Sequence, residues 1–515
     1  MLPQRTSSMT AEACGMSEPL AAQHGAATAK ERCLPRERTA LFVRGSALAG
    51  AGAPAHDRKS GLCVAALCAI TCLLPAYGRH QQEVTRNFDR TVTLPAGRQL
   101  RIESKFGEVK VRGTSQRDVV IHAVIRTAGG SPSEAEELAN KVRIEVNQGA
   151  SEVSIRTIYP ERSSGWFGSK STSYSVNFDI TYPESAPLEI RNEFGEVRTS
   201  DCKGGARIVN GHGALIVRNG KGTQNLEDSF GAVEVAGNEG DVTISNGNGA
   251  ITVSDVTGRV NLRNRFGRIS VTKAGQGATI VNNNGAITLA DSGGASNVTN
   301  SFGAVTATSV RGDLTIRNSN GAVDAHNVTG SAWLINSFGA ITASEIGKSL
   351  EATGSNGAVS ANRVGGTATV RNSFGATTIE DAGGVDVTSG NGAVRALGVR
   401  GAAKVHTSFG GILIENVSGP VDASNSNGSI TVTASAAGGC QPITLKTTFG
   451  PIKLALPGNA NYNVSASTSF GGIKTEFPVT VSGQTNSESL QGKIGNGGCE
   501  LKIVGSNGRI EIVKR

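Results

Sequence analysis

A repeat of 18 residues runs through the centre of this chain. Phe-Gly pairs recur 36 residues apart, with one final spacing of 35 residues, at Phe194, Phe230, Phe266, Phe302, Phe338, Phe374 and Phe409. Midway between them stand Asn-Gly pairs at Asn248, Asn284, Asn320, Asn356, Asn391 and Asn427, and His212-Gly213 fills the first such slot. So strict a period indicates stacked copies of one supersecondary unit.

Each unit contains two short stretches of alternating apolar and polar residues, as in FGAVTATSVRGDLTIRNS at 302–319. Such alternation predicts β-strands, and the glycine after Phe or Asn predicts a corner with positive φ or close backbone approach. Helical patterns are absent between these stretches, which argues against βαβ units. We predict an all-β fold, a parallel β-solenoid of about 14 regular 18-residue units with irregular β caps at both ends. At ~4.8 Å between stacked strands, the regular units would span about 65 Å.

A second column of residues lies two positions before each corner. It holds asparagine in most units, including Asn246, Asn264, Asn282, Asn300, Asn318 and Asn336. Stacked amides can hydrogen-bond along such a rod, so we expect a structural ladder. If 18 residues make one turn, Phe and Asn alternate in one corner column; if 36 residues do, each has its own corner. The shorter turn is favoured because 18 residues already supply two strands and two turns.

The chain divides into four predicted segments. Residues 1–78 are a leader, and 79–187 form a β-rich N-terminal cap with one short helix. Residues 188–436 form the regular solenoid, and 437–515 form an irregular C-terminal solenoid cap. The helix is expected from Pro132 to about Lys141, because Ser131 and Glu134 form a capping box and Pro132 occupies the first helical position.

The leader contains a predicted export signal at 58–78. Two basic residues precede an apolar stretch at 62–74, and small residues suit cleavage after Gly78. That stretch is shorter than the ~20 residues of a membrane span. A lipid anchor on Cys72 is the alternative, although its flanking residues fit a lipoprotein box poorly. Residues 1–57 fit an over-long gene start. We therefore expect an exported protein of the periplasm, outer surface or extracellular space.

Cysteine usage fits an oxidising compartment. After removal of the leader, Cys440 and Cys499 could pair, and Cys202 is expected to be a buried, inert thiol. Neither the cysteines nor the scattered histidines have the spacing of a metal site, so we expect no metal and no cofactor. A net charge of +8 is small for 515 residues, and no run of Lys or Arg indicates nucleic-acid binding.

Three stretches of the sequence carry a family resemblance. They are LRIESKFGEVKVRG from Leu100, LEIRNEFGEV from Leu188 and the closing GKIGNGGCELKIVGSNGRIEI. Together with the interrupting helix and the repeats, residues 84–515 resemble the bacterial putative-adhesin domain family of β-helical envelope proteins of largely unknown function. The resemblance implies an exported, non-enzymatic surface protein and brings no catalytic residues. This chain departs from the family by its regular Phe or Asn before glycine and by its many turns.

An enzyme is the alternative, because some β-solenoids are polysaccharide lyases or hydrolases. Asp386 and Asp422 are predicted to point outward two turns apart, about 9.6 Å by strand spacing. Inverting glycosidases separate their carboxylates by ~6.5–9.5 Å. Lys404 falls between the two aspartates, however, so an opposite-charge ladder is the simpler interpretation.

Exposed aromatic residues are the predicted contact points. Trp333 should project outward, where its indole could stack on a sugar ring. Trp166 and Phe167 lie in a loop with basic flanks, which could touch a glycan, a partner or an anionic headgroup, or instead cover the open end of the solenoid. We expect an adhesin or interaction scaffold whose partner is a glycan or an envelope protein surface, with no nucleic acid and with membrane contact only through the leader or a lipid anchor. End-to-end polymerisation of the rod is a further alternative.

Overall fold

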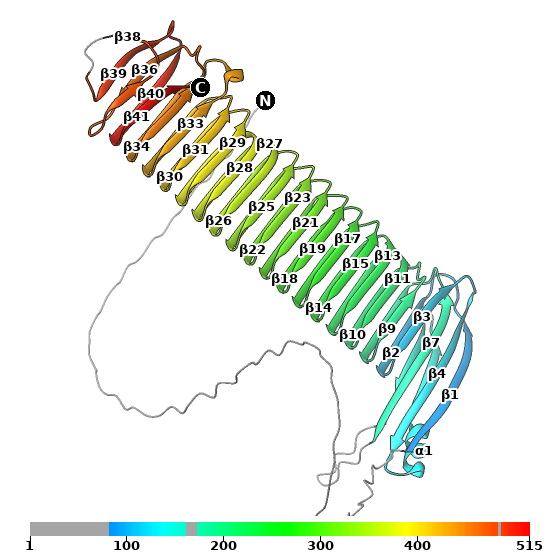
Figure 1. Ribbon diagram of the computed structural model, residues 1–515. Helices are drawn as coiled ribbons and strands as arrows, with labels where there is room; N and C mark the ends of the chain where they lie inside the picture. Colours follow the sequence, from blue (N-terminus) through cyan, green and yellow to red (C-terminus); the bar gives the residue numbers. More distant parts are fainter. Residues whose placement is uncertain (1–81, 161–171, 483–485) are drawn as a thin grey trace, which may run out of the picture. The chain divides into compact units, whose positions relative to one another are not determined.

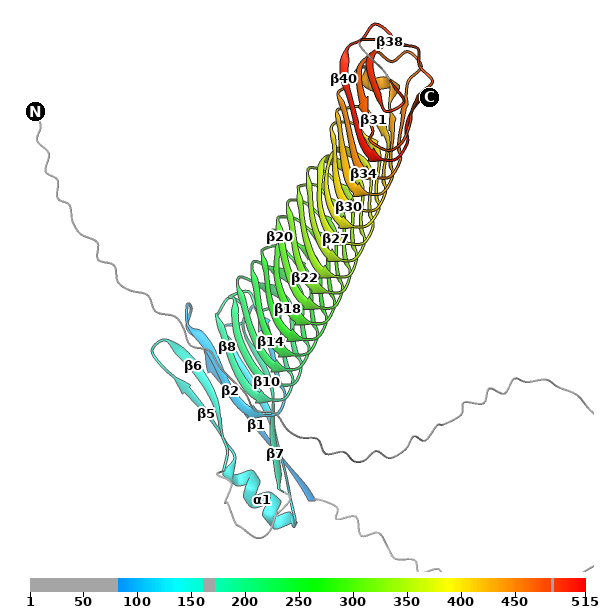
Figure 2. The same ribbon diagram turned by 90° about the vertical axis from the view of Figure 1, so that its left-hand side faces the viewer.

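The computed structural model describes residues 82–160, 172–482 and 486–515. Every described residue belongs to one compact unit, 77–515. This unit is almost entirely β-structure and winds into a parallel β-solenoid of about 15 turns. Figures 1 and 2 show its turns stacked into a rod, with α1 near one end and β38 at the other. The predicted fold class is confirmed.

Each regular turn contributes one strand to each of two rows. β20 (Ser296–Phe302) pairs in parallel with β22 (Leu314–Asn320), and β21 (Val305–Val310) pairs with β23 (Val323–Val328). Residues opposite each other differ by 18 in number, so that Phe302 lies opposite Asn320. The 18-residue turn is therefore confirmed, and Phe and Asn alternate in one corner column.

The same pairing repeats along the rod. The first row contains β8 (Leu188–Phe194), β10 (Ala206–His212), β12 (Gln224–Phe230), β14 (Val242–Asn248), β16 (Val260–Phe266), β18 (Ala278–Asn284), β20, β22, β24 (Ala332–Phe338), β26 (Leu350–Asn356), β30 (Ala403–Phe409), β32 (Val421–Asn427) and β34 (Ile443–Phe449). The second row contains β9 (Val197–Ser200), β11 (Leu215–Lys221), β13 (Val233–Glu239), β15 (Ile251–Val256), β17 (Ile269–Ala274), β19 (Ile287–Ser292), β21, β23, β25 (Ile341–Ile346), β29 (Val394–Val399), β31 (Ile412–Val417), β33 (Ile430–Ala434) and β35 (Ile452–Leu456). Two long strands, β27 (Val359–Phe374) and β28 (Thr377–Asn391), contribute to both rows.

Strand alternation builds the core of the rod. In the turn of β21 and β22, Val305, Ala307, Leu314 and Ile316 point inward and are at most 1% exposed. The polar residues between them face solvent. Burial of such a set in every turn supplies the main stabilisation, because apolar area removed from water contributes about 25 cal/mol per Å².

One regular turn is one residue shorter than the others, and the missing residue falls at a single position in that turn. Val364 lies opposite Ala382, whereas Thr367 lies opposite Gly384, so the register shifts between these pairs. Glycines at this turn allow the shorter path. The strands on either side keep their register, which explains why a 17-residue unit does not interrupt the columns.

The solenoid begins ahead of the regular repeats. β2 (Gln99–Phe106) and β3 (Val109–Thr114) pair in parallel with β8 and β9, so residues 99–114 form a solenoid turn. The chain then leaves the stack through β4 (Asp118–Gly129), α1 (Pro132–Lys141), β5 (Arg143–Gln148), β6 (Glu152–Ile158) and β7 (Ser173–Pro183). β1 (Gln82–Thr93) and β7 flank β4 in antiparallel order, and β6 and β7 cover the outer edges of β2 and β3.

The predicted helix and its cap are confirmed. Ser131 is the N-cap, and its side chain accepts a hydrogen bond from the Glu134 N–H at 3.2 Å. The Glu134 side chain in turn accepts from the Gly130 N–H at 3.1 Å. Of the described helices, none is long and apolar enough to cross a membrane.

At the C-terminal end the chain order and the spatial order differ. β40 (Cys499–Asn507) and β41 (Ile510–Lys514) stack directly on β34 and β35. The intervening segment carries β36 (Tyr462–Ser467), β37 (Ile473–Thr475), β38 (Val479–Val481) and β39 (Ser489–Ile494), and a short 3-10 helix, η1 (Ala436–Gly438), precedes β34. Phe449 lies opposite Asn507, and Phe470 bridges to Asn507 from the other side. Phe and Asn therefore still alternate in space where the sequence period is lost.

Candidate functional site

The asparagine column forms a continuous hydrogen-bond network inside the corner of the rod. Nδ2 of Asn318 donates to the carbonyl oxygens of Gly303 and Gly321, both at 3.2 Å. The Gly303 carbonyl also accepts from Nδ2 of Asn300 at 3.1 Å. Amides and corner carbonyls thus alternate along the rod. All six predicted ladder residues make the two bonds and are buried: Asn246, Asn264, Asn282, Asn300, Asn318 and Asn336.

The bonds differ from those expected of stacked amides. The amides are in register but donate to backbone carbonyls, because the carbonyl of each corner glycine lies between two successive Nδ2 atoms. A direct amide–amide bond joins Asn192 to Asn210 at 3.2 Å. Within the part of the chain that the structure describes, the Oδ1 atoms of the six ladder residues find no hydrogen-bond partner. The column is buried and its donors are used, so it stabilises the corner and presents nothing to a ligand.

Asp228 occupies one position of this column. It is 5% exposed, and neither of its carboxylate oxygens finds a hydrogen-bond partner among the described residues. Burial raises the pKa of Asp228 to about 7, and the nearby Asn210 amide and Ser229 N–H offset only part of that rise. A protonated carboxyl has an O–H donor where the other turns have an amide N–H. The column therefore favours the neutral form of Asp228.

The corner glycines are required by both conformation and space. Gly321 has a φ of +119°, and a Cβ added there would lie 2.4 Å from the Gly303 carbonyl oxygen. Gly303 has a φ of +122° and the same distance to the Gly285 carbonyl. Successive corners thus stack backbone on backbone, which the sequence predicted from glycine alone.

The residue before each corner glycine forms an outer column, here called the aromatic ridge. Its phenylalanines are 42% to 73% exposed: Phe194, Phe230, Phe266, Phe302, Phe338, Phe374, Phe409, Phe449 and Phe470. Strand alternation alone would place Phe302 on the buried side with Asn300. The chain turns at the corner, so the ring projects outside instead. Sequence reasoning identified the position but missed this exposure.

Rings stack along the ridge where successive turns carry them. Phe106 and Phe194 lie parallel within 10°, with centroids 5.3 Å apart. His212 lies between Phe194 and Phe230, at 4.6 and 4.9 Å and within 5° of both planes. In the regular turns that follow, asparagine takes the place of His212. A hollow of about 520 Å³ lies on this part of the ridge, and Phe230, Asn248 and Phe266 are among the residues that line it.

Trp333 is the predicted contact residue that the structure describes. It lies in β24, between Thr315 and Glu351 of the neighbouring strands, and is 52% exposed. Glu351 also pairs with Arg371 at 3.1 Å. The indole therefore projects from a row of parallel strands beside an ion pair. Trp166 and Phe167 lie outside the described residues.

The candidate carboxylates of the enzyme alternative are not brought together. Asp386 lies opposite Lys404, and Lys404 lies opposite Asp422, so a lysine strand separates the two aspartates. In residues 82–160, 172–482 and 486–515 no group of three or more His, Cys, Asp or Glu side chains could hold a metal ion. Nothing in this geometry favours glycoside chemistry.

The corner opposite the ridge carries a groove of about 770 Å³. Residues with positive φ line it in successive turns, including Asp255 (φ 55°), Lys273 (φ 58°) and Asp291 (φ 54°). The Lys273 ammonium lies 2.9 Å from an Asp255 carboxylate oxygen. Charges of opposite sign therefore neighbour each other between turns, and we assign no ligand to this groove.

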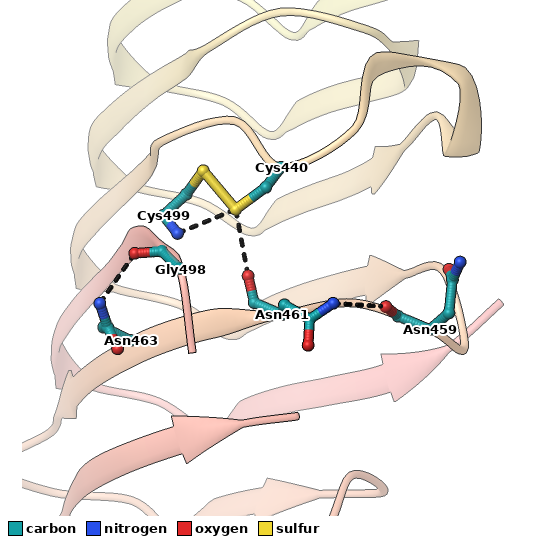
Figure 3. The surroundings of a disulfide bond; sticks show 6 residues. All are labelled: Cys440, Asn459, Asn461, Asn463, Gly498 and Cys499. Carbon is teal, nitrogen blue, oxygen red and sulfur yellow. Dashed lines mark hydrogen bonds between the residues drawn. A yellow bond between two sulfur atoms is a disulfide. The ribbon is translucent and has the colours of Figure 1, made fainter. Parts of the chain in front are cut away.

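A disulfide joins Cys440 and Cys499, the pair that the sequence left possible, near the C-terminal end (Figure 3). The Cys499 N–H donates to the Cys440 Sγ at 2.9 Å, and Asn463 donates to the Gly498 carbonyl at 2.8 Å. Cys202 is a free, buried thiol whose pKa burial raises to about 11. Such a thiol is inert at neutral pH, as the sequence predicted.

These features define a β-solenoid with a hydrogen-bonded interior column of asparagines and an exposed outer column of phenyl rings. Residues 340–513 match the family model of the Toastrack DUF4097 domain, and this match supports the resemblance to the putative-adhesin domain family. No curated protein is significantly similar to the chain.

The chain is also similar to several solved bacterial structures. A putative cell adhesion protein from Clostridium sporogenes is 9% identical, with 84% of this chain and 100% of that chain covered and a TM-score of 0.14. A putative adhesin from Bacteroides fragilis is 12% identical over 64% of this chain and 98% of that chain, with a TM-score of 0.17. A putative lipid binding protein from Parabacteroides distasonis is 9% identical over 72% and 96% of the two chains, with a TM-score of 0.15.

Proposed function

We propose that this protein is an exported, non-enzymatic interaction scaffold of the cell envelope, with an adhesin-like role. The observation that supports the proposal is the register that the regular turns keep along their outward columns, which the one short turn does not interrupt. It holds outward side chains at fixed spacing along a rigid rod, as an extended contact surface requires. The two aspartates of the enzyme alternative, by contrast, are separated by Lys404.

The row of strands around Trp333 is the proposed contact face. An exposed indole offers a large apolar surface and one N–H donor, which suits stacking on a sugar ring or on an apolar patch of an envelope protein. Thr315 and Glu351 beside it supply polar groups for hydrogen bonds. Trp166 and Phe167 are proposed as a second contact point.

Two observations support export. The apolar stretch at 62–74 has the length and flanks of a signal peptide. The Cys440–Cys499 disulfide belongs to an oxidising compartment such as the periplasm or the extracellular space. Mass analysis of the N-terminus of the mature protein tests export, and a product beginning after Gly78 is expected. A lipid on Cys72 would instead anchor the rod, and an intact leader would contradict export.

The contact face is tested with purified mature protein against a panel of polysaccharides and isolated envelope fractions. Binding is expected to weaken at least about 5-fold in Trp333→Ala, because a stacked aromatic contributes about 1 kcal/mol or more. Thr279→Ala, in the same outward column but three turns away, is the matched control and should bind normally. Polysaccharide turnover that Asp386→Asn or Asp422→Asn abolishes would overturn the proposal in favour of an enzyme.

A further inference from the structure

The aromatic ridge has a shape that its own alternation creates. Phe302 and Phe338 are separated by two turns, about 9.6 Å along the rod. Asn320 stands between them in the same column and is shorter than a phenyl ring. The regular ridge is therefore a row of projecting rings separated by slots that are one turn high.

His212 shows which group fits such a slot. It occupies an asparagine position of the column, and its ring lies parallel between Phe194 and Phe230 at 4.6 and 4.9 Å. These are the separations of stacked aromatic rings. A flat ring entering the slot above Asn320 or Asn356 from outside would make the same two contacts. The aromatic ridge of a second copy of this chain presents rings with the same period as the slots.

The flanks of the ridge allow two copies to approach between residues 301 and 427. The residue before the Phe or Asn is serine in nearly every turn, as in Ser301, Ser319, Ser337, Ser355 and Ser373. The residue after the glycine is alanine in most turns, as in Ala304, Ala322, Ala340, Ala358 and Ala376. These small, uncharged side chains neither block nor repel a like surface. Near Phe266, by contrast, Arg265 and Arg268 flank the column.

We propose that two copies of this chain associate side by side through this ridge, in antiparallel orientation, with the rings of each filling the slots of the other. In the central register Phe302 lies level with the partner's Asn427, and Phe338 with the partner's Asn391. The two-fold axis passes between the levels of Asn356 and Phe374. Rings of the two chains then alternate at about 4.8 Å, the spacing that His212 has within one chain.

The antiparallel arrangement is closed. A two-fold interface uses the same patch on both chains, so assembly stops at a dimer. Two parallel, staggered copies would instead leave free slots at both ends, and further copies would add there. The interface also removes from water four half-exposed phenyl rings per chain, at Phe302, Phe338, Phe374 and Phe409. Trp333 lies outside this ridge, so the dimer and the proposed contact face are independent.

The first test measures the dissociation constant of the dimer by sedimentation of the mature protein. Phe338→Asn/Phe374→Asn is expected to raise it at least about 100-fold, because four stacked rings are lost per dimer. Asparagine already occupies this corner in alternate turns, so the fold is preserved, which circular dichroism verifies. Trp333→Asn removes an equally exposed aromatic ring from another face and should leave the constant unchanged. A monomeric wild type at millimolar concentration, or equal weakening by Trp333→Asn, overturns the proposal.

The second test fixes the register without touching a ring. Asn356→Cys places a thiol about one turn, or ~4.8 Å along the axis, from its own copy across the two-fold axis. Asn284→Cys lies about nine turns, or ~43 Å, from its copy and is the matched control. Oxidation is expected to yield a covalent dimer of the first variant and none of the second. Cross-linking of Asn284→Cys, or none at Asn356→Cys, overturns the antiparallel register.

Discussion

Two columns of this solenoid lie two residues apart in every turn and behave in opposite ways. The inner column, with Asn300 and Asn318, is buried and hydrogen-bonded to corner carbonyls. The outer column, with Phe302 and Asn320, stands at the corner itself, and its rings project into solvent. Equal periodicity in the sequence therefore does not mean an equal role. The inner column should determine stability, and the outer column should determine association.

The largest expected effect is at the corner backbone that separates the columns. Gly321→Ala places a Cβ 2.4 Å from the Gly303 carbonyl oxygen at a φ of +119°. We expect a loss of more than about 3 kcal/mol in the free energy of unfolding, because backbone atoms must move apart in a stacked turn. Urea denaturation measures it. Gly458→Ala, where an added Cβ meets no atom of the described residues within 4 Å, should change stability by less than about 0.5 kcal/mol.

Removal of one inner amide is expected to cost less. Asn318→Leu deletes both hydrogen bonds to the carbonyls of Gly303 and Gly321, so the free energy of unfolding should fall by about 2–3 kcal/mol. Thermal and urea unfolding measure the change. Asn356→Ala, in the outer column, is the control and should lie within about 0.5 kcal/mol of the wild type. Equal losses at both positions would contradict the division between the columns.

Asp228 offers a pH-dependent test of the inner column. Its folded-state pKa of about 7 exceeds the ordinary value of 3.8. Between about pH 4 and pH 7 the folded state therefore keeps a proton on Asp228 that the unfolded state releases. The free energy of unfolding consequently falls as the pH rises through this range. Asp228→Asn should stabilise the protein by on the order of 4 kcal/mol at pH 8 and should have little effect below pH 4. Equal stabilisation at both pH values would contradict a buried, neutral carboxyl.

The smallest expected effect is at the outer column. Phe374→Asn reproduces the residue of the neighbouring turns and removes a ring that is 54% exposed. At concentrations where the protein is monomeric, the free energy of unfolding should change by less than about 0.5 kcal/mol. A loss comparable to that of Asn318→Leu would show that the ring supports the fold.

The two ends of the rod show where sequence reasoning succeeded and where it stopped. The helix at Pro132–Lys141 and its Ser131 cap are local features, and both were predicted. Phe470 was predicted to keep a Phe-Gly corner, but its place next to Asn507 in the stack was not predicted. Its spacing in the sequence is irregular, yet in space it extends the alternation of Phe449 and Asn507. An insertion displaces residues along the chain without displacing the stack, which no linear period can reveal.

The sequence by itself determined the 18-residue repeat, the buried strand faces and the glycine corners, because period, alternation and absence of a side chain are local properties. That one repeat makes one turn was decided by the pairing of Phe302 with Asn320. The sequence also indicated the Cys440–Cys499 pair and the inert Cys202. Tertiary structure alone decided that the asparagine amides bond to corner carbonyls, that Asp228 is buried among them, and that the phenyl rings point outward. Those outcomes depend on how the chain turns at the corner and what the neighbouring turn places there, which only stacking in three dimensions sets.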